Sequence, residues 1–503
     1  MTLSRRGFLV GTAATAGATL IGCTPRGQRS VVSTAMPPTI THGVQSGDVS
    51  DGTAQVWARC SEPAHMLVEW STTSAFATTT AVRGPLVGPD RDHTGLTALA
   101  NLPAGQTIHY RVKFEREVDR GATEWTVGRL QTPRADKLRI AWTGDTCGQG
   151  YGRNPDWGGL KGYESILNAK PDLFLHVGDL IYADNPILPE QTTWDGRVWK
   201  NVSNERVARV AQELEDFRAR FAYNFEDSNV AALAKNVACI AQWDDHETHN
   251  NWFPGQILED DRYIKENRAS VLAAWAMQAT REWTPIGGAT VNRVIHYGPL
   301  LDIVVVDLRT FRTPNDANTG QGEAMLGSAQ ARWLVDALET SKARWKIVAC
   351  DQPLALVIGD GPNNSRQEGY ANGVPGAPSG REAELAGVLA ALKQRGVKNV
   401  VWLTADVHYA AHHAFDPKNA SAVFDPFHEF VAGPIHAGTF GPNVLDPTFG
   451  PEAKFVWAPP PGQGNLAPWD GLQSFGTIDV TKDHLHVELV GIDGKPRYAI
   501  DLT

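Results

Sequence analysis

From residue 138 onward, the chain alternates short, uninterrupted apolar runs with segments whose apolar residues recur at helical spacing. A strand that is apolar at every position needs cover on both faces, so this alternation predicts an α/β fold in which helices flank buried sheets. The strand-like runs span 138–142, 173–177, 237–242, 303–306, 346–349 and 400–403, and the helical segments span 204–233, 268–283, 329–338 and 381–392. Alternating patterns return near the C-terminus and predict antiparallel strands at 476–480, 484–490 and 497–502.

Residues 38–132 have a different sequence pattern, in which apolar and polar residues alternate along short runs. Such runs occur at 54–59, 66–70 and 108–114, with turn residues between them. The pattern is typical of an antiparallel β-sandwich of the immunoglobulin or fibronectin III type. We therefore expect a β-sandwich domain at 38–132 and a larger α/β domain at 133–503. Because the sandwich holds no cluster of candidate ligands, we expect its role to be structural or adhesive.

The N-terminus has the pattern of an export signal. Arg5 and Arg6 form a twin-arginine pair, and the weakly apolar stretch that follows is too short to span a bilayer. This stretch ends in Leu20-Ile21-Gly22-Cys23, which resembles a bacterial lipobox whose cysteine is acylated. We expect a signal at 1–23, a polar tether at 24–37, and export by the twin-arginine machinery to the periplasm or cell surface, with a lipid anchor at Cys23. An ordinary signal peptide cleaved nearby is the alternative.

The composition argues against some partners and cross-links. The formal net charge is −10, and an acidic surface repels the phosphate backbone, so we do not expect duplex nucleic acid as a partner. The chain has five cysteines, but none of them form a C-x-x-C motif, and a domain of this size needs no disulfide framework. An apolar content of 42% fits a folded soluble protein.

Candidate metal ligands follow four of the predicted strands directly. In chain order they are Asp145 with Cys147, Asp179 with Tyr182, Asp245 with His246, and Asp406 with His408. Each pair alone is compatible with an ordinary turn or helix cap. However, the carboxyl ends of parallel strands meet at one edge of a sheet, where open α/β sheets bind ligands. A tyrosine becomes a ligand only when a strongly Lewis-acidic ion removes its proton. Together, the four pairs predict a site for more than one metal ion.

The order of these motifs resembles that of the calcineurin-like metallophosphoesterases, and the tyrosine in the second motif looks like that of purple acid phosphatases. The resemblance is closer still to the alkaline phosphatase D, or PhoD-like, family. The segments that carry it are Gly144-Asp145-Thr146-Cys147, Gly178-Asp179-Leu180-Ile181-Tyr182, Trp243-Asp244-Asp245-His246-Glu247, Asn250-Asn251-Trp252 and Asp406-Val407-His408. The family implies a four-layer core of two packed sheets flanked by helices, with an N-terminal immunoglobulin-like domain.

The resemblance also implies Fe³⁺ together with one or two Ca²⁺ ions. Carried over by position, Cys147, Asp179 and Tyr182 would bind the ferric ion, because thiolate and phenolate donors favour trivalent iron. Asp179 would bridge the metals. Asp406 and His408 would hold the calcium side, which leaves the identity of the second metal open.

Two positions depart from the family pattern. Asp145 places an acid two residues before Cys147, at the general ligand position of the superfamily, where it could add a ligand or change the second metal. Asp245 occupies the place where the superfamily has a bridging asparagine. Whether Asp244 or Asp245 points inward is open at this stage.

These assignments predict an exported enzyme that hydrolyses a small phosphate ester by attack of a metal-bound hydroxide on phosphorus. His246 would donate a proton or hydrogen bond to the leaving oxygen, or would only be a structural hydrogen bonder. Asn250 would contact the phosphate, and Arg309 would either clamp it or form a salt bridge. A phosphodiesterase or phospholipase D-like hydrolase at the same site is the alternative. An alternative outside the enzymes is an inactive surface lipoprotein whose β-sandwich binds a partner.

Overall fold

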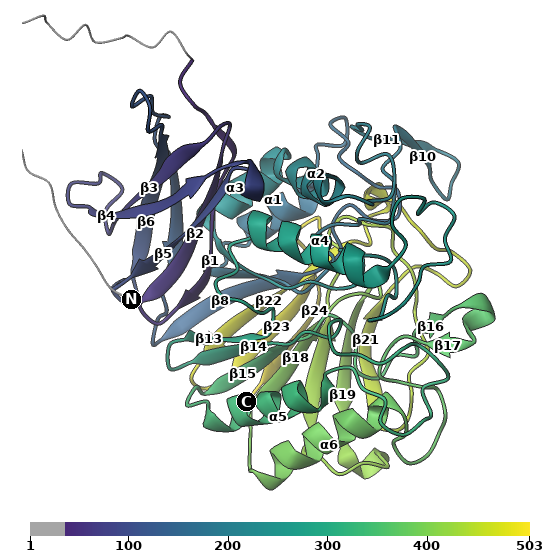
Figure 1. Cartoon of the computed structure of the whole chain (residues 1–503). Helices are drawn as coiled ribbons and strands as arrows, with labels where there is room; N and C mark the ends of the chain where they lie inside the picture. Colours follow the sequence, from purple (N-terminus) through teal and green to yellow (C-terminus); the bar gives the residue numbers. More distant parts are fainter. Residues whose placement is uncertain (1–35) are drawn as a thin grey trace, which may run out of the picture. The chain divides into compact units, whose positions relative to one another are not determined.

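The strands form a nine-stranded, a seven-stranded and a four-stranded sheet, with two small hairpins, in the computed structural model, which describes residues 36–503 (Figure 1). The predicted export signal, with Arg5, Arg6 and Cys23, and nearly all of the predicted tether lie outside the described residues. Among the described residues, no helix combines the length and the apolar character needed to cross a membrane.

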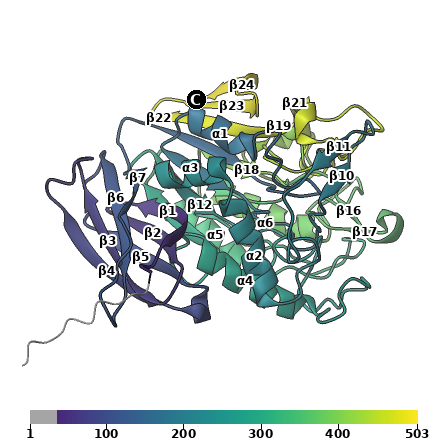
Figure 2. The ribbon, with the colours of Figure 1, turned by 90° about the horizontal axis from the view of Figure 1, so that it is seen from above.

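The nine-stranded sheet joins strands from both ends of the chain. Its order is β24 (Pro496–Leu502), β23 (Leu485–Gly491), β22 (Ser474–Thr481), β8 (Lys137–Thr143), β9 (Leu173–His176), β12 (Ala238–Ala241), β1 (Ile40–Ser50), β2 (Thr53–Cys60) and β5 (Thr94–Ala100). Strands β8, β9, β12 and β1 are parallel to their neighbours in this group, and the flanking pairs are antiparallel. Figure 2 shows β22–β24 and β1, β2 and β5 at opposite ends of this sheet.

The seven-stranded sheet has a parallel centre. Its order is β13 (Arg293–Tyr297), β14 (Leu301–Val305), β15 (Trp345–Ala349), β18 (Val400–Thr404), β20 (Phe427–Val431), β19 (Ala410–Phe415) and β21 (Pro451–Trp457). The four-stranded sheet has the order β4 (Thr80–Val87), β3 (Ala64–Ser71), β6 (Thr107–Glu115) and β7 (Thr126–Gln131). The two hairpins are β10 (Glu190–Thr192) with β11 (Val198–Lys200), and β16 (Gly359–Asp360) with β17 (Arg366–Gln367).

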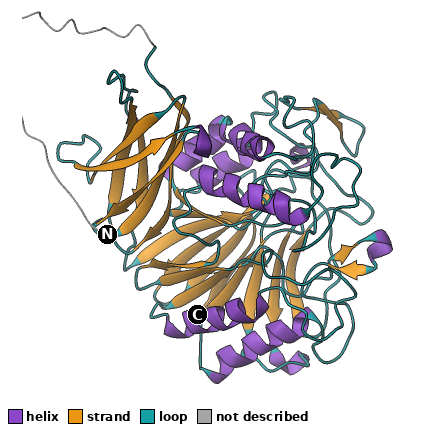
Figure 3. Cartoon of the chain, in the orientation of Figure 1, coloured by secondary structure: helices purple, strands orange, loops and turns teal. Residues whose placement is uncertain are grey.

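The helices lie in two groups on either side of the large sheets (Figure 3). One group is α1 (Lys161–Asn168), α2 (Leu214–Phe225), α3 (Ser228–Asn236) and α4 (Ala269–Trp283), and the other is α5 (Gly327–Thr340) and α6 (Arg381–Gln394). Short 3₁₀ turns occur at Pro89–Arg91, Pro362–Asn364, Pro417–Asn419 and Pro468–Asp470.

The helical pattern at 204–233 predicts one helix, but 204–213 form turns and loop, and the helical part that begins at Leu214 is divided into α2 and α3 because the chain breaks at Asp227. Its carboxylate accepts hydrogen bonds from the backbone of Asn229 and Val230 and so begins α3 as an N-cap.

The uninterrupted apolar strands are explained by burial on both faces. In β9, Leu173 and Leu175 belong to the core between the two large sheets, whereas Phe174 packs with the side chains of α1 and α3. In β14, Ile303 faces the same central core and Val304 packs with α5 and α6. Successive side chains of a strand point to opposite faces, so a strand with helices on one side and a sheet on the other is apolar throughout. The α/β fold with an N-terminal β domain is therefore as expected.

The N-terminal β domain is joined to the rest of the chain through a shared sheet. Strand β1 pairs in parallel with β12, where Gly47 lies opposite Cys239. A Cβ atom at Gly47 would stand 2.3 Å from the carbonyl oxygen of Cys239 and 2.4 Å from Pro285 Cγ, so only glycine allows this approach. Beside it, Arg293 binds Asp48 through a salt bridge of 2.7 Å. The two predicted domains therefore meet through backbone and buried charge, not through a loose linker.

Candidate metal centre

Four parallel strands from two sheets deliver the candidate ligands: β8, β9 and β12 belong to the nine-stranded sheet and β18 to the seven-stranded sheet. The sequence predicts one sheet edge, but the ligands meet where the edges of these two sheets come together. Asp145 follows β8, Asp179 follows β9, Asp245 follows β12, and Asp406 follows β18. The ligand atoms form three groups within which every atom lies no more than 4.8 Å from the others: Asp145 with Asp179 and His408, Asp179 with Asp245 and His246, and Asp244 with Asp245 and Asp406. Asp179 belongs to the first two groups and Asp245 to the last two, so the groups form one continuous chain.

Several oxygens in these groups are buried without a hydrogen bond. Among the described residues, Asp145 Oδ2, Asp179 Oδ2 and Asp245 Oδ1 have no partner. A buried carboxylate oxygen without a partner is costly, and three of them facing the same small volume repel one another. Cations relieve both costs at once, because carboxylate oxygens are the preferred ligands of hard ions. The residues present therefore fit a metal centre.

Asp145, Asp179 and Asp406 hold their protons tightly in the absence of such ions, whereas the charges of His246 and Arg309 lower the pKa of Asp245 despite its burial. Burial, reinforced by the charge of neighbouring acids, raises the pKa of Asp145, Asp179 and Asp406 well above the ordinary range. Burial and the nearby charges of Asp179 and Asp145 likewise raise the pKa of the Tyr182 phenol. A metal ion that binds here must displace these protons, so its affinity rises with pH.

The backbone at the ligands is strained. Asp145, Asp179, Asp406 and His408 have φ values of 67°, 54°, 62° and 62°, in the left-handed region that L-residues adopt at a cost of about 1–3 kcal/mol each. Glycine makes room beside them, since a Cβ atom at Gly433 would stand 2.4 Å from Asp145 Oδ2. Strain of this kind is characteristic of sites whose geometry is imposed by function.

Tyr182 and His408 lie together on one side of the centre. The phenol oxygen is 2.7 Å from His408 Nε2 and 3.4 Å from Asp145 Oδ1, and the ring stacks on His246 at a centroid distance of 4.1 Å. His408 Nδ1 lies at hydrogen-bond distance from the carbonyl oxygen of Gly438, which favours the tautomer that donates from Nδ1 and presents a lone pair at Nε2. Burial lowers the pKa of His408 to about 4, so the ring is neutral and able to bind a metal.

Cys147 does not join these ligands. Its side chain lies in an apolar cluster with Leu160, Tyr163 and Ile166, and it belongs to none of the three groups found among the described residues. Burial raises the pKa of the Cys147 thiol above its usual value. Of the two candidates that follow β8, only Asp145 belongs to one of these groups.

His246 is held in its charged form by Asp184. Its Nδ1 lies 2.7 Å from Asp184 Oδ1, and the other oxygen of Asp184 accepts a hydrogen bond of 3.0 Å from the backbone of Asn250. Although burial disfavours the imidazolium, the charges of Asp184 and Asp245 raise the pKa of His246 to about 9. The side chain of Asn250, the predicted phosphate contact, is exposed at the edge of the pocket described below.

Arg309 forms a salt bridge instead of facing the centre as a free clamp. It is fully buried, with Nε 2.5 Å from Asp244 Oδ1 and Nη1 2.5 Å from Glu368 Oε1. Of the two roles that the sequence leaves open, the structure shows the ion pair. Of the adjacent acids Asp244 and Asp245, both belong to a ligand group and point inward, and Arg309 neutralises Asp244.

Two acids of the site were missed by the sequence-based predictions. Asp351 follows β15, the neighbour of β18, and is buried; its Oδ2 has no hydrogen bond among the described residues and lies 3.8 Å from Arg309 Nε. Its signal was the one used for the other ligands, an aspartate just after a predicted strand. Glu247 accepts hydrogen bonds from the backbone of Leu180 and Asp244, and so ties the β9 and β12 loops together. Burial and the charge of Asp244 raise the pKa of Glu247 to about 8.

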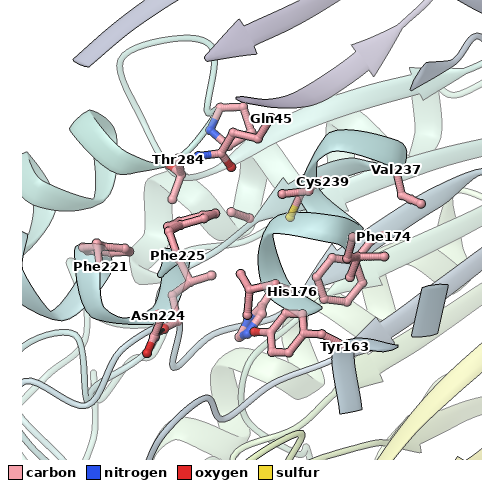
Figure 4. A pocket seen from close by; sticks show the side chains of 16 residues that line it. Gln45, Tyr163, Phe174, His176, Phe221, Asn224, Phe225, Val237, Cys239 and Thr284 are labelled. Carbon is pink, nitrogen blue, oxygen red and sulfur yellow. Dashed lines mark hydrogen bonds between the residues drawn. The ribbon is translucent and has the colours of Figure 1, made fainter. Parts of the chain in front are cut away.

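Two cavities flank this region. An open pocket of about 670 Å³ reaches His246 and Asp184 and is lined further out by polar residues. A small apolar cavity of about 60 Å³ lies by the β12 strand, where Figure 4 shows Phe174, Cys239 and His176 around it. None of the predicted metal ligands lines the apolar cavity. Of the two, only the open pocket is lined by a residue of the ligand groups, His246.

Comparison with known families agrees with this geometry. The profile of the PhoD-like phosphatases matches residues 140–489, and that of the PhoD-like phosphatase N-terminal domain matches 26–134. The chain belongs to the PhoD-like phosphatase family. It is 27% identical over 437 residues to alkaline phosphatase D of Bacillus subtilis (strain 168), which covers 80% of this chain and 70% of that protein. As a member of this family, the protein is a phosphoric ester hydrolase.

Solved structures show the same fold. A structure of PhoD superposes with a TM-score of 0.68 at 21% identity and covers 94% of this chain and 90% of its own. A purple acid phosphatase from yellow lupin (Lupinus luteus) seeds has a TM-score of 0.57 at 12% identity and covers 93% of this chain and 74% of its own. The arrangement of the two large sheets is thus common to both kinds of phosphatase.

We predict that the metal-free protein loses stability as the pH rises from 6.5 to 9. The folded-state pKa values of His246, about 9 against 6.5, and Glu247, about 8 against 4.5, are raised, so the stability that these groups contribute is lost as the pH passes through those values. Histidines with a lowered pKa, such as His408 at about 4, make the protein more stable as the pH rises, but this effect is complete by pH 6.5.

The measurement is thermal unfolding of chelator-treated protein across this pH range, with metal ions restored in a parallel series. The decline should be reduced in the metal-loaded series. An unfolding midpoint temperature of the metal-free protein that rises between pH 6.5 and 9 would contradict the raised pKa values of His246 and Glu247.

Proposed function

We propose that the protein hydrolyses phosphate esters, in the manner of an alkaline phosphatase D, at a centre of at least two metal ions. Asp145, Asp179, Tyr182 and His408 would hold one ion, and Asp245 and Asp406 would hold another. The resemblance assigns His408 to the calcium side with Asp406, but here it is proposed for the first ion because it lies with Asp145 and Asp179. The observation that carries the proposal is the set of buried, unpaired carboxylate oxygens of Asp145, Asp179 and Asp245. Asp179 reaches the first and second ligand groups, which supports a bridging role.

The donor types suggest which ions are bound. A phenol with a strongly raised pKa gives up its proton only to a highly charged ion, so Tyr182 favours Fe³⁺ on its side of the centre. The group of Asp244, Asp245 and Asp406 offers only carboxylate oxygens, which suit Ca²⁺. In this proposal Asp145 replaces Cys147 in the ferric ligand set, because the thiol lies in the apolar cluster.

When bound, the metal ions supply a nucleophilic water and neutralise charge on the phosphoryl oxygens. The side chains of the protein position the ester and supply the proton for the leaving group. His246, charged through its bond to Asp184, is placed to give a proton to the leaving alcohol oxygen. Arg309 withdraws the charge of Asp244 from the centre, which lowers the repulsion among the acids without contacting the phosphate.

The same residues suit either a phosphomonoester or a phosphodiester, so a phosphodiesterase or phospholipase D-like activity is the second candidate. An inactive surface lipoprotein is disfavoured, because a centre without function has no reason to keep its unpaired carboxylates together at the cost of strained backbone.

The first test is a substrate panel. Protein supplied with Fe³⁺ and Ca²⁺ should hydrolyse p-nitrophenyl phosphate or its bis-ester, and Asp179→Asn should lower the rate by about 100-fold or more, because one bridging ligand is lost. The rate of p-nitrophenol release is measured together with the metal content by elemental analysis. If the wild-type protein loaded with both metal ions hydrolyses neither ester, the proposal is wrong.

The second test separates the two candidate ligands of β8. Asp145→Asn should reduce the bound iron, whereas Cys147→Ala should leave the metal content and the spectrum unchanged, because the thiol packs against apolar side chains. Tyr182→Phe should remove any visible charge-transfer band and keep the fold. The measurements are visible absorption and iron content of the purified variants. Loss of iron in Cys147→Ala with retention in Asp145→Asn would reverse the assignment.

The proposal includes export by the twin-arginine route to the periplasm or cell surface, with a lipid anchor at Cys23. It is supported by Arg5, Arg6 and the lipobox-like sequence at 20–23. Arg5→Lys with Arg6→Lys should retain the protein in the cytoplasm, and Cys23→Ser should prevent incorporation of labelled fatty acid. Fractionation of host cells and lipid labelling are the measurements, and normal export of the double lysine variant would refute this route.

A further inference from the structure

The open pocket borders the metal centre at His246. His246 lines its inner end, is only 5% exposed, and belongs to the ligand group that contains Asp179 and Asp245. Its Nδ1 is bound to Asp184, and among the described residues its Nε2 makes no hydrogen bond. This nitrogen is therefore available to a ligand that enters the pocket. When a phosphate occupies the centre, the ester oxygen on the His246 side has the rest of its alcohol in this pocket.

The charge of the pocket is negative. Four of its lining residues are acids, and the cations that line it are Arg262 and the imidazolium of His246. Two of the acids are already neutralised locally, because Asp184 pairs with His246 at 2.7 Å and Asp260 with Arg262 at 2.6 Å. The other two, Glu259 and Asp261, are exposed and take part in no salt bridge among the described residues. Two carboxylates therefore face the pocket without a compensating cation.

An alcohol with additional negative charge would be repelled at this position. A positively charged alcohol would be attracted, and the side chains of Gln149, Asn185 and Asn250, which also line the pocket, offer amide oxygens to an ammonium group. The pocket volume of about 670 Å³ accommodates a group larger than a methyl or ethyl alcohol.

We infer that the preferred substrate is a phosphate ester whose leaving alcohol carries a positive charge, such as a primary or quaternary amino alcohol, with Glu259 and Asp261 as the residues that select it. This rests on the proposed function. In the reaction, water adds across the P–O bond: the phosphoryl group keeps the water oxygen, and the alcohol oxygen leaves with a proton that His246 is placed to give. The water supplies the protons overall, so no further reactant is required.

The test uses two substrates of the same shape. Choline phosphate carries a quaternary ammonium, and 3,3-dimethylbutyl phosphate is its neutral carbon isostere; each is used as the monoester and as the methyl diester. With the metal-loaded full-length protein at low ionic strength, we expect kcat/KM for the choline ester to exceed that of the isostere by about tenfold, the size of one favourable charge interaction near a protein surface. The ratio should fall in 0.5 M salt to about twofold, because screening acts on exposed charges.

A double variant localises the effect. Glu259→Gln with Asp261→Asn should reduce the ratio to about two or below, mainly through a higher KM for the choline ester. The matched control, Asp336→Asn with Glu339→Gln, removes the same charge from two exposed acids of α5 and should leave the ratio at its wild-type value.

The outcomes separate this inference from the function on which it rests. If p-nitrophenyl esters are hydrolysed but the two isosteres react equally in the wild type, the charge selection is wrong and the phosphatase assignment stands. A ratio that both double variants lower to the same extent would also overturn it, because the effect would then come from the overall charge. If no ester of any kind is hydrolysed, the proposed function itself fails.

Discussion

The mutual repulsion of buried acids where the edges of the two large sheets meet is the constraint on which the rest of the structure depends. Asp145, Asp179, Asp244, Asp245 and Asp351 are each about 1% exposed, and their neighbours raise the pKa of several of them further. Folding alone gives no reason to gather such groups, because each pays a desolvation cost and repels the others. The arrangement becomes favourable when cations enter it, so the fold is organised around ions that it must bind.

The protein neutralises part of this charge itself, through a connected network behind the centre. Arg309 binds Asp244 and Glu368, and Arg312 binds the same carboxylate of Glu368. Asn315, which accepts from Arg312, donates to the backbone of Asn251. The amide of Asn251 in turn donates to Asp245 Oδ2. The two adjacent acids are thus tied to one network from opposite sides. A buried network of this kind fixes the orientation of its members, and the loss of one partner leaves another charge uncompensated.

The N-terminal β domain contributes to the position of this network through backbone continuity. Strand β1 extends the nine-stranded sheet past β12, and Trp57 donates a hydrogen bond of 2.6 Å from its indole nitrogen to the carbonyl oxygen of Glu282 at the end of α4. Because β12 leads directly into Asp244 and Asp245, its neighbour β1 braces the strand that carries the ligands. The domain holds no ligand group of its own among those found in the described residues, so its role at the site is support.

Much of the centre was determined by local sequence. A strand that is apolar on both faces must be buried, and a carboxylate placed directly after it must lie at the sheet edge, so Asp145, Asp179, Asp245 and Asp406 were predictable from position alone. The different surroundings of Asp145 and Cys147 were not predictable, because both residues have left-handed φ angles in one tight turn, and the direction of each side chain depends on what packs against that turn. The role of Arg309 also lay beyond the sequence, since Glu368 is 59 residues away. The side-chain directions in strained turns and the ion pairs between residues distant in sequence depend on tertiary packing, so only the tertiary structure decided them.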